Sequence, residues 1–364
     1  MKKLLRILLI LVILLVAAII ILPIVFQGRI QDEIKKAAND NLNAELAFSD
    51  VGLSLISNFP NLTLDIDELA LTGVDQFEGV ELFGTQKLTA TIDLMSIFGD
   101  TIAVREIRLD NARVDIRVLS DGAANYDIAK ADTTTTETAE EAPSESGGFA
   151  LNLQSYAIND ASIRYDDATL PMELELHDFN HSGSGDFTAT VFNLVTRSTA
   201  GALDVVYDGV RYVREAPVEL DATIEIDNAQ ARYTLKENVI KMHQLALRAD
   251  GWVAMPEESI DMDISFATID SDILHLLSVV PSAFAADLTG VQASGSMDLS
   301  GFVRGSYTDA VMPGFGLDLK VNNGRFQYPD LPKSVENISI DAEIDASDGI
   351  DNDAMKVDVN RFYL

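Results

Sequence analysis

Apolar and polar residues alternate with a period of two over most of this chain. The pattern recurs over 62–66, 88–94, 114–118, 172–176, 220–226, 260–266 and 338–344. Successive side chains of a β-strand point to opposite faces, so each segment is expected to be a strand with one apolar and one hydrated face. Asp-Gly, Asn-Gly and other glycine-containing turns separate the runs. The pattern therefore predicts a mainly β fold built on a mostly antiparallel sheet.

Only two segments beyond the amino terminus have a helical period. Residues 29–43 place Ile30, Ile34, Ala38 and Leu42 on one stripe, and 270–287 holds a cluster of Ile, Leu and Val residues. Two short helices are too few to cover the apolar faces of so many strands. The sequence leaves two alternatives for these faces: a closed β-sandwich core, or an elongated, twisted sheet curled into an open apolar groove.

The amino terminus carries the longest apolar segment. Residues 7–26 contain no charge and follow Lys2, Lys3 and Arg6. As a helix this run would be about 30 Å long, which matches the hydrocarbon core of a bilayer. A cleaved signal peptide would have a shorter apolar region and a small-x-small site, which 23–29 does not offer. The run predicts a transmembrane anchor at 1–28, with a short cytoplasmic tail and the bulk of the chain on the other side.

Charge narrows the classes of partner. The chain has 58 acidic against 26 basic side chains and a net charge of −32. Proteins bind nucleic acid backbones through Lys and Arg, so this surface excludes nucleic acid as a partner. It also repels anionic headgroups, so any lipid contact has to use the apolar side of the protein. The absence of cysteine excludes disulfides and thiolate metal sites.

A change of composition divides the chain. Residues 131–148, ADTTTTETAEEAPSESGG, contain no large apolar residue and are predicted to form an acidic disordered linker. This linker separates a proximal β-region at 29–130 from a distal β-region at 149–364. The last ten residues, MKVDVNRFYL, have the pattern of a strand. We therefore expect the distal region to be truncated at its C-terminus, as the front part of a longer protein.

An eight-residue pattern occurs four times. It reads apolar, two Asp or Asn, small, any, apolar, polar, then Ile or Tyr, and its copies begin at Leu109, Ile158, Ile226 and Val321. Asp and Asn bond to nearby backbone and tolerate left-handed geometry, so each octet is predicted to be a turn that launches a strand. The spacings are too uneven for a strict solenoid. Repeated units of an elongated sheet and ordinary antiparallel turns both remain open.

Three stretches resemble AsmA-like proteins. They are FSDVGLSLISNFPNLTLDIDELALTG at 48–73, IAVREIRLDNARVDIRVLSDGAANYDI at 102–128 and MPGFGLDLKVNNGRFQYPDLPKSVENISID at 312–341. The positions that carry the resemblance are Val51, Leu53, Phe59, Pro60, Ile107, Leu109, Ala112, Val114, Ile116, Asp121, Gly122, Asn125 and Tyr126. The likeness covers 1–130 and 295–364 well and the middle of the chain loosely.

The resemblance implies a fold and a function. AsmA-like proteins are anchored in the bacterial inner membrane, extend into the periplasm, and curl a β-sheet into a long groove similar to that of bridge-like lipid-transfer proteins. The implied function is phospholipid movement between membranes in outer-membrane biogenesis. This chain is shorter than the family's long members, which questions whether it bridges two membranes by itself.

No catalytic or metal-binding motif stands out. His177 and His181 have a spacing that could hold a metal on a helix, but they follow a strand pattern without a third ligand, so we predict a hydrated turn. Residues 345–353 resemble a calcium loop but lack its alternating acids and closing Glu, so we predict an acidic turn. We expect no enzyme activity and no cofactor.

The candidate site is instead a lining of apolar strand residues. The candidates are Leu62, Leu64, Ile66, Ile92, Leu94, Val114 and Ile116 near the anchor, and Ile224, Ile264, Phe266, Leu317, Leu319, Phe326 and Ile340 distally. The expected function is to bind or conduct phospholipid acyl chains from an inner-membrane anchor at 7–26, with other envelope proteins as a further class of partner. The alternative is a non-enzymatic, membrane-tethered β-sandwich scaffold for envelope assembly that carries no lipid.

Overall fold

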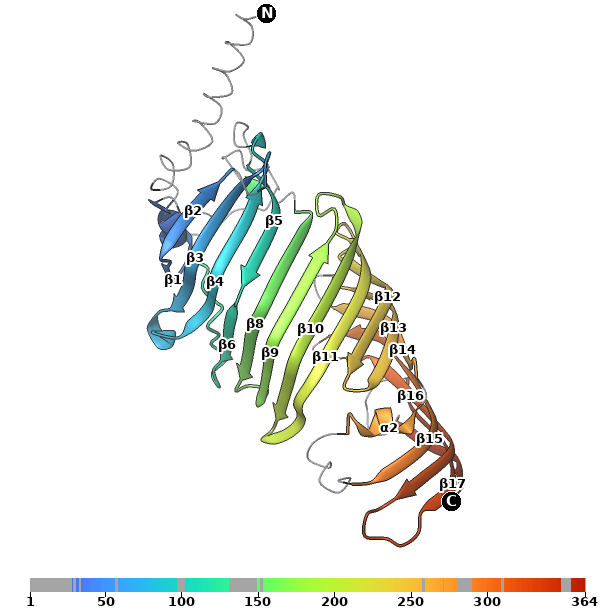
Figure 1. Cartoon of the computed structure of the whole chain (residues 1–364). Coiled ribbons are helices and arrows are strands. Elements are labelled where there is room, and N and C mark those ends of the chain that lie inside the picture. Colours follow the sequence, from blue (N-terminus) through green and yellow to red (C-terminus); the bar gives the residue numbers. More distant parts are fainter. Residues whose placement is uncertain are drawn as a thin grey trace, which may run out of the picture. The chain divides into compact units, whose positions relative to one another are not determined.

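The protein is mainly β and divides into two compact units, Met1–Pro171 and Met172–Leu364. The computed structural model (Figure 1) describes residues 28, 31–32, 34–55, 58–96, 102–130, 149–150, 153–256, 259–270, 272–280, 290–308, 311–347 and 355–363. The predicted anchor at 7–26 and the predicted linker at 131–148 lie outside these residues.

The first unit, Met1–Pro171, is called the proximal unit below, and the second is called the distal unit. The proximal unit consists of strands that pair mostly with their chain neighbours. Its elements are β1 (Ala44–Ala47), β2 (Asp50–Ser54), β3 (Leu62–Gly73), η1 (Asp75–Phe77), β4 (Glu81–Ile92), β5 (Ile102–Asp110), β6 (Arg113–Val118), β7 (Phe149–Ala150) and β8 (Ser155–Asp167). β1 and β2 both pair with β3, β3 pairs with β4, and β4 pairs with β5 and β6, all antiparallel. β5 and β6 together pair with β8 in parallel.

The parallel pairing places two of the octets side by side. Leu109 lies opposite Ile158, and the partnership continues in register to Ile116 opposite Tyr165. At the break between β5 and β6, the Asn111 amide donates to the Asn159 carbonyl at 2.8 Å, which keeps the two copies hydrogen-bonded. Equivalent residues of the first two octets therefore lie opposite each other, and the sequence spacing between these octets equals the register offset of the parallel pairing.

The octets are not all turns, contrary to the prediction. The copies at 158 and 321 lie within β8 and β16 (Gly314–Gln327), the copy at 109 spans the short break between β5 and β6, and only the copy at 226 forms a hairpin turn. In the three strand copies the third residue has a left-handed backbone, with φ of 53° at Asn111, 51° at Asp160 and 51° at Asn323. Asp and Asn tolerate this conformation, so the octet marks a kink inside a strand.

The kinks of the proximal unit line up across its sheet. Glu68 in β3 also has a left-handed backbone, with φ of 52°, and its two chain neighbours pair with the β4 residues on either side of Gln86. Gln86 in turn accepts a hydrogen bond from the side chain of Asn111 at 2.9 Å. Beside this row, the buried hydroxyl of Thr85 donates to the carbonyl of Asp110 at 2.8 Å. Such a row of irregular residues bends strands and increases their twist.

The distal unit is an antiparallel meander in which each strand pairs with the next one. Its strands are β9 (Met172–Ser184), β10 (Val191–Tyr207), β11 (Val210–Asp227), β12 (Arg232–Met242), β13 (Leu245–Ala254), β14 (Ile260–Thr268), β15 (Gln292–Tyr307), β16 (Gly314–Gln327), β17 (Val335–Ala346) and β18 (Lys356–Tyr363). Every ladder from β9–β10 to β17–β18 is antiparallel, as the alternating pattern predicts.

Helices are short in the described part of the chain. Residues 34–41 are helical, and Ile34 packs against a proximal core cluster of Val51, Ile66 and Leu69. In the distal unit α2 (Ile273–Leu277) begins after Asp272, whose carboxylate accepts from the Leu274 amide at 2.9 Å. The predicted helix at 270–287 is thus shorter where it is described, and 281–289 lies outside the described residues.

Candidate functional site

One face of the proximal sheet carries continuous rows of apolar side chains. Residues directly opposite each other on neighbouring strands point to the same face. The ladders align Val51, Ile66, Leu88, Leu109 and Ile158 in one such row from β2 to β8. The β2–β3 end of the row is covered, because Val51 has no exposed surface and Ile66 is 6% exposed within a core cluster. Leu88, Leu109 and Ile158 are half-buried, so the rest of the row keeps some contact with solvent.

The distal sheet carries longer rows. Leu194, Ile224, Leu235, Ile264 and Val303 follow one another across the ladders from β10 to β15. Gly251 lies between Leu235 and Ile264, and the row continues through Phe315 to Ala346 on β17. At about 4.8 Å per strand, this row is roughly 34 Å long. A second row beside it runs through Ala249, Phe266, Gly301, Leu317, Ile344 and Val357.

All but one of the fourteen sequence candidates fall on strands. In the proximal unit Leu62 lies opposite Ile92, and Val114 lies opposite Phe83, which packs on the same core cluster as Leu88. The distal candidates share the apolar face through the pairs Phe266–Gly301 and Gly301–Leu317 and the neighbouring ladders. Leu94 is the exception, because β4 ends at Ile92 and Leu94 lies in the turn that follows.

The burial of the candidates distinguishes two kinds of position. Ile66 and Ile92 are buried, with 6% of each residue exposed, and they belong to proximal core clusters. The other twelve candidates are half-buried. Apolar residues in a closed core are usually fully buried. Most of the candidate lining therefore retains contact with solvent.

One part of the distal apolar face is covered. Leu245, Met297 and Val321 form a buried cluster, and Met297 has no exposed surface. Ile273, Leu276 and Val279, in α2 and just after it, pack against this cluster, as do the candidates Leu319 and Ile340. The helix therefore closes the apolar face near its contacts with β13 and β15.

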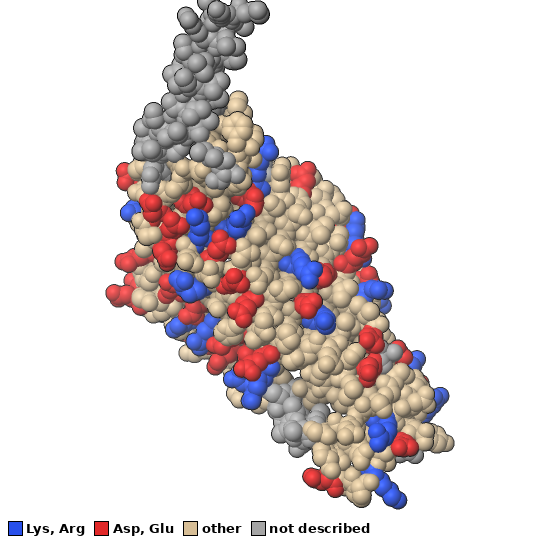
Figure 2. Space-filling view, viewed as in Figure 1, with Lys and Arg blue, Asp and Glu red and all other residues tan. Residues whose placement is uncertain are grey.

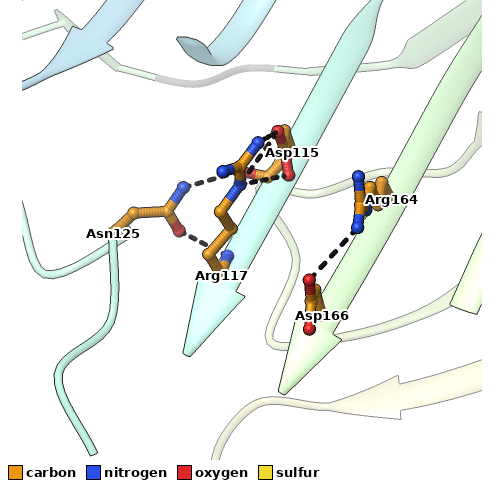
Figure 3. Close-up of polar contacts among 5 residues, drawn as sticks. All are labelled: Asp115, Arg117, Asn125, Arg164 and Asp166. Carbon is orange, nitrogen blue, oxygen red and sulfur yellow. Dashed lines mark hydrogen bonds and ion pairs between the residues drawn. The ribbon is translucent and has the colours of Figure 1, made fainter. Parts of the chain in front are cut away.

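The opposite faces are polar and rich in ion pairs. Figure 2 shows Lys and Arg interspersed with Asp and Glu on the face of the proximal unit turned to the viewer. In Figure 3 two of these pairs lie side by side on parallel strands: Arg117 contacts Asp115 at 2.6 Å and Arg164 contacts Asp166 at 3.2 Å. The hydrogen bond to Asp115 raises the pKa of Arg117. Alternating charges in this arrangement fit a hydrated surface and offer no reactive group.

Asn125 explains part of the resemblance motif at 121–126. Its side chain is almost fully buried; it donates to the Asp115 carbonyl at 2.6 Å and accepts from the Arg117 amide at 2.8 Å (Figure 3). It thus hydrogen-bonds the edge of β6 beyond Val114, the last β6 residue that pairs with β4. The role of this residue is structural, and sequence reasoning identified the position without its contacts.

The histidines and acidic residues form no metal centre among the described residues. His177 and His181 lie within β9 and not in a turn, which corrects the prediction. His181 contacts the Ser198 hydroxyl at 2.8 Å, and burial lowers its pKa. Of the predicted acidic turn, 345–347 is described and 348–353 lies outside the described residues.

Sequence reasoning missed several members of the rows. Leu194, Leu235, Val303 and Phe315 were not predicted, although they lie in the same row as Ile224 and Ile264. Leu235 precedes a register shift in β12, and the glycines around Val303 and Phe315 interrupt the apolar alternation. Alternation is readable along one strand, whereas a row across strands depends on the register of each ladder.

No helix in the described part of the chain is long and apolar enough to cross a bilayer. The predicted span at 7–26 is not among these residues.

A protein-family model described as "AsmA family" matches residues 1–251. No curated protein and no solved structure matches the chain. The match contains the first two stretches on which the resemblance was based and the whole proximal unit. The resemblance of residues 295–364 lies beyond it and remains a prediction.

Proposed function

The chain belongs to the AsmA family, whose members are generally non-enzymatic proteins of the cell envelope, and on this premise we propose that its apolar sheet faces bind phospholipid acyl chains in the periplasm. The single observation that carries the proposal is the half-exposed apolar row from Leu194 to Phe315. It crosses the distal ladders without interruption by a charged side chain. The anchor at 7–26 would hold the protein in the inner membrane.

The energetics favour an apolar occupant. Transfer of a methylene group from water to apolar surroundings contributes about 0.8 kcal/mol. An acyl chain laid along a row would bury many methylenes together with the exposed parts of residues such as Ile224, Ile264 and Leu317. Neither surface needs a polar partner for this contact. The net charge of −32 also makes the apolar face, and not a headgroup contact, the better source of affinity.

The strand kinks support the groove form of the proposal. Left-handed residues and register shifts recur in the distal ladders, for example between Ala200 and Leu203 and between Val321 and Gly324. Bulges bend strands and increase their twist, so a sheet with many of them curls more easily than a flat one. Curling would bring the edges of the apolar rows toward a bound chain.

A closed scaffold without bound lipid is the alternative. The part of the apolar face at Leu245, Met297 and Val321 favours it, because α2 covers this cluster. If the apolar face were closed in the same way throughout, the protein would have no room for lipid. The two functions therefore differ in whether phospholipid reaches the rows outside this cluster.

Photocrosslinking at two matched phenylalanines tests the proposal. Phe266 lies in the second apolar row, whereas Phe302 lies on the opposite face of the adjacent strand, and both are half-buried. We would replace each in turn by p-benzoylphenylalanine, irradiate living cells and identify adducts by mass spectrometry. We expect phospholipid adducts at position 266 and few at position 302. Equal labelling at the two positions, or none at 266 in a folded protein, would favour the scaffold.

A further inference from the structure

A cavity of about 590 Å³ lies on the polar face of the distal sheet, between β13 and β16. This volume is within the range of small-molecule sites. The ladders place Arg248, Ala267, Ser300 and Asp318 in one row across its four strands. Small side chains therefore lie at the centre of the row and long or charged ones at its ends, which leaves a depression in the surface.

Three of the charged side chains around this cavity have no ionic partner. Arg248, Asp250 and Asp318 make no ion pair with any residue that the structure describes. The fourth, Arg304, contacts Asp263 at 2.9 Å. On other parts of the polar faces, arginines commonly contact a carboxylate, as Arg117 and Arg164 do. The cavity thus brings unpaired charges of both signs to one place without joining them.

The remaining lining supplies hydroxyls and two phenylalanines, Phe266 and Phe302. Ser265 and Ser300 contribute hydroxyls, and the Phe302 ring lies against Gly316 of the next strand. A side chain larger than hydrogen at Gly316 would collide with that ring. The absence of a side chain there lets the ring lie along the sheet, with the Arg304 guanidinium over it at 5.2 Å from the ring centroid.

These groups select a neutral ligand with many hydroxyls. An anion would face two carboxylates, and a cation would face two guanidinium groups. For either ion, repulsion from the like charges would offset the attraction to the opposite ones. A hydroxyl both donates and accepts, so it can donate to Asp250 or Asp318 and accept from Arg248 or Arg304 in charge-assisted hydrogen bonds. We infer that this cavity is a binding site for a hexopyranose sugar ring, held by hydrogen bonds between its hydroxyls and these four charged side chains.

The sugar site differs from the proposed lipid site, because its charged groups lie on the opposite face of the sheet, although Phe266 of the second apolar row also borders the cavity. The sugar could be part of a free glycan or the headgroup of a glycolipid. Both sources have the same ring chemistry, and they differ in whether an attached alkyl chain strengthens binding.

Tryptophan fluorescence offers a direct readout. Trp252 is the only tryptophan of the chain, and it lies two residues from Asp250 on the same face of β13. We would titrate the full chain, in a detergent without a sugar headgroup, with glucose, galactose, mannose and N-acetylglucosamine. Saturation-transfer NMR would detect the bound sugar independently. At least one of the four is expected to give a saturable response in both measurements.

Matched variants decide whether the cavity is responsible. The double variant Asp250→Asn/Asp318→Asn keeps the shape of the site and is expected to weaken binding at least tenfold. Asp221→Asn removes a carboxylate from the polar face of β11, beside Arg197, and should leave affinity unchanged. Methyl and octyl glucoside then separate the sources: equal affinities indicate a free glycan, and tighter octyl glucoside indicates a glycolipid headgroup. No saturable response to any of the four sugars, or unchanged affinity in the double variant, would overturn the inference.

Discussion

Asn125 shows how a single buried polar side chain can supply the hydrogen bonds that a neighbouring strand would otherwise make. β6 loses its β4 neighbour after Val114, and the chain returns along its edge through a turn at Gly122, where φ is 86°. The Leu119 amide then donates to the Ala123 carbonyl at 2.8 Å, and the Asn125 amide group bonds to the backbone of β6. A buried backbone group without a partner is costly, so this side chain stabilises the end of the strand.

Replacement of Asn125 by alanine should destabilise the protein. The change leaves the Asp115 carbonyl and the Arg117 amide without their side-chain partner, and each such loss costs about 1–3 kcal/mol. Chemical denaturation followed by circular dichroism would measure the free energy of unfolding. Asn193→Ala, at an exposed position of β10, is the control and should change stability by less than about 0.5 kcal/mol. Equal effects of the two changes would contradict the role given to Asn125.

Asp167 should make stability depend on pH in the acid range. Its carboxylate accepts from the Thr169 hydroxyl at 2.6 Å and the Tyr165 hydroxyl at 2.7 Å, and these bonds lower its pKa from 3.8 to about 2. Because the folded-state pKa is the lower one, the unfolded chain binds more protons between these values. The stabilisation is complete above about pH 4 and is lost as pH falls toward 2.

The comparison of wild type with Asp167→Asn tests this prediction. An amide does not titrate, so the variant should lose less stability than wild type between pH 5 and pH 2. Parallel losses in the two proteins would mean that other carboxylates govern the acid response.

At the scale of the element, the left-handed residues are the feature that most shapes the strands. Asn323 is an example. It lies in the middle of β16, where β-branched residues are usual, yet its φ is 51°. The following Gly324 is buried, and a Cβ atom on it would lie 3.0 Å from the Cβ of Ile338. An Asn-Gly pair accommodates both the backbone conformation and the close approach of β17.

Valine at position 323 should therefore cost more than glycine. Left-handed geometry costs an L-residue roughly 1–2 kcal/mol, and a β-branched side chain tolerates it least. We expect Asn323→Val to lower the unfolding free energy by at least that amount and Asn323→Gly to be neutral or slightly stabilising. Asn322→Val is the matched control, since this neighbour is also exposed and has an ordinary backbone. A larger effect at 322 than at 323 would refute the assignment of the kink.

The same elements show what the sequence could predict. Alternation at 62–66, 220–226, 260–266 and 338–344 identified strands and their apolar sides, because that periodicity is local. The octets were recognised and all four were assigned to turns, which is wrong for three of them, since an Asp-Asn pair has the same local preferences in a hairpin and in a bulge. The parallel pairing of β5 and β6 with β8 was not predicted, because pairing between distant segments leaves no periodic signal.

At the scale of the whole molecule, family membership and the apolar sheet faces both support the proposed contact with lipid. The AsmA match covers residues 1–251, and the rows of apolar side chains occur on both sides of that limit, as Ile224 and Leu317 show. Each unit combines a charged face with an apolar one. This asymmetry is expected of a sheet that keeps one side in water and offers the other to hydrocarbon.

The most direct test of acyl-chain binding is the amount of phospholipid that co-purifies with the full chain. Leu194 and Val195 are adjacent on β10 but face opposite sides, with Leu194 in the apolar row and Val195 54% exposed on the polar face. Mass spectrometry of wild type, Leu194→Asp and Val195→Asp would compare bound lipid, with circular dichroism confirming that each is folded. We predict about one or more phospholipids per wild-type chain, the same for Val195→Asp, and a severalfold loss for Leu194→Asp. A folded wild-type protein without lipid, or equal lipid in all three, would contradict it.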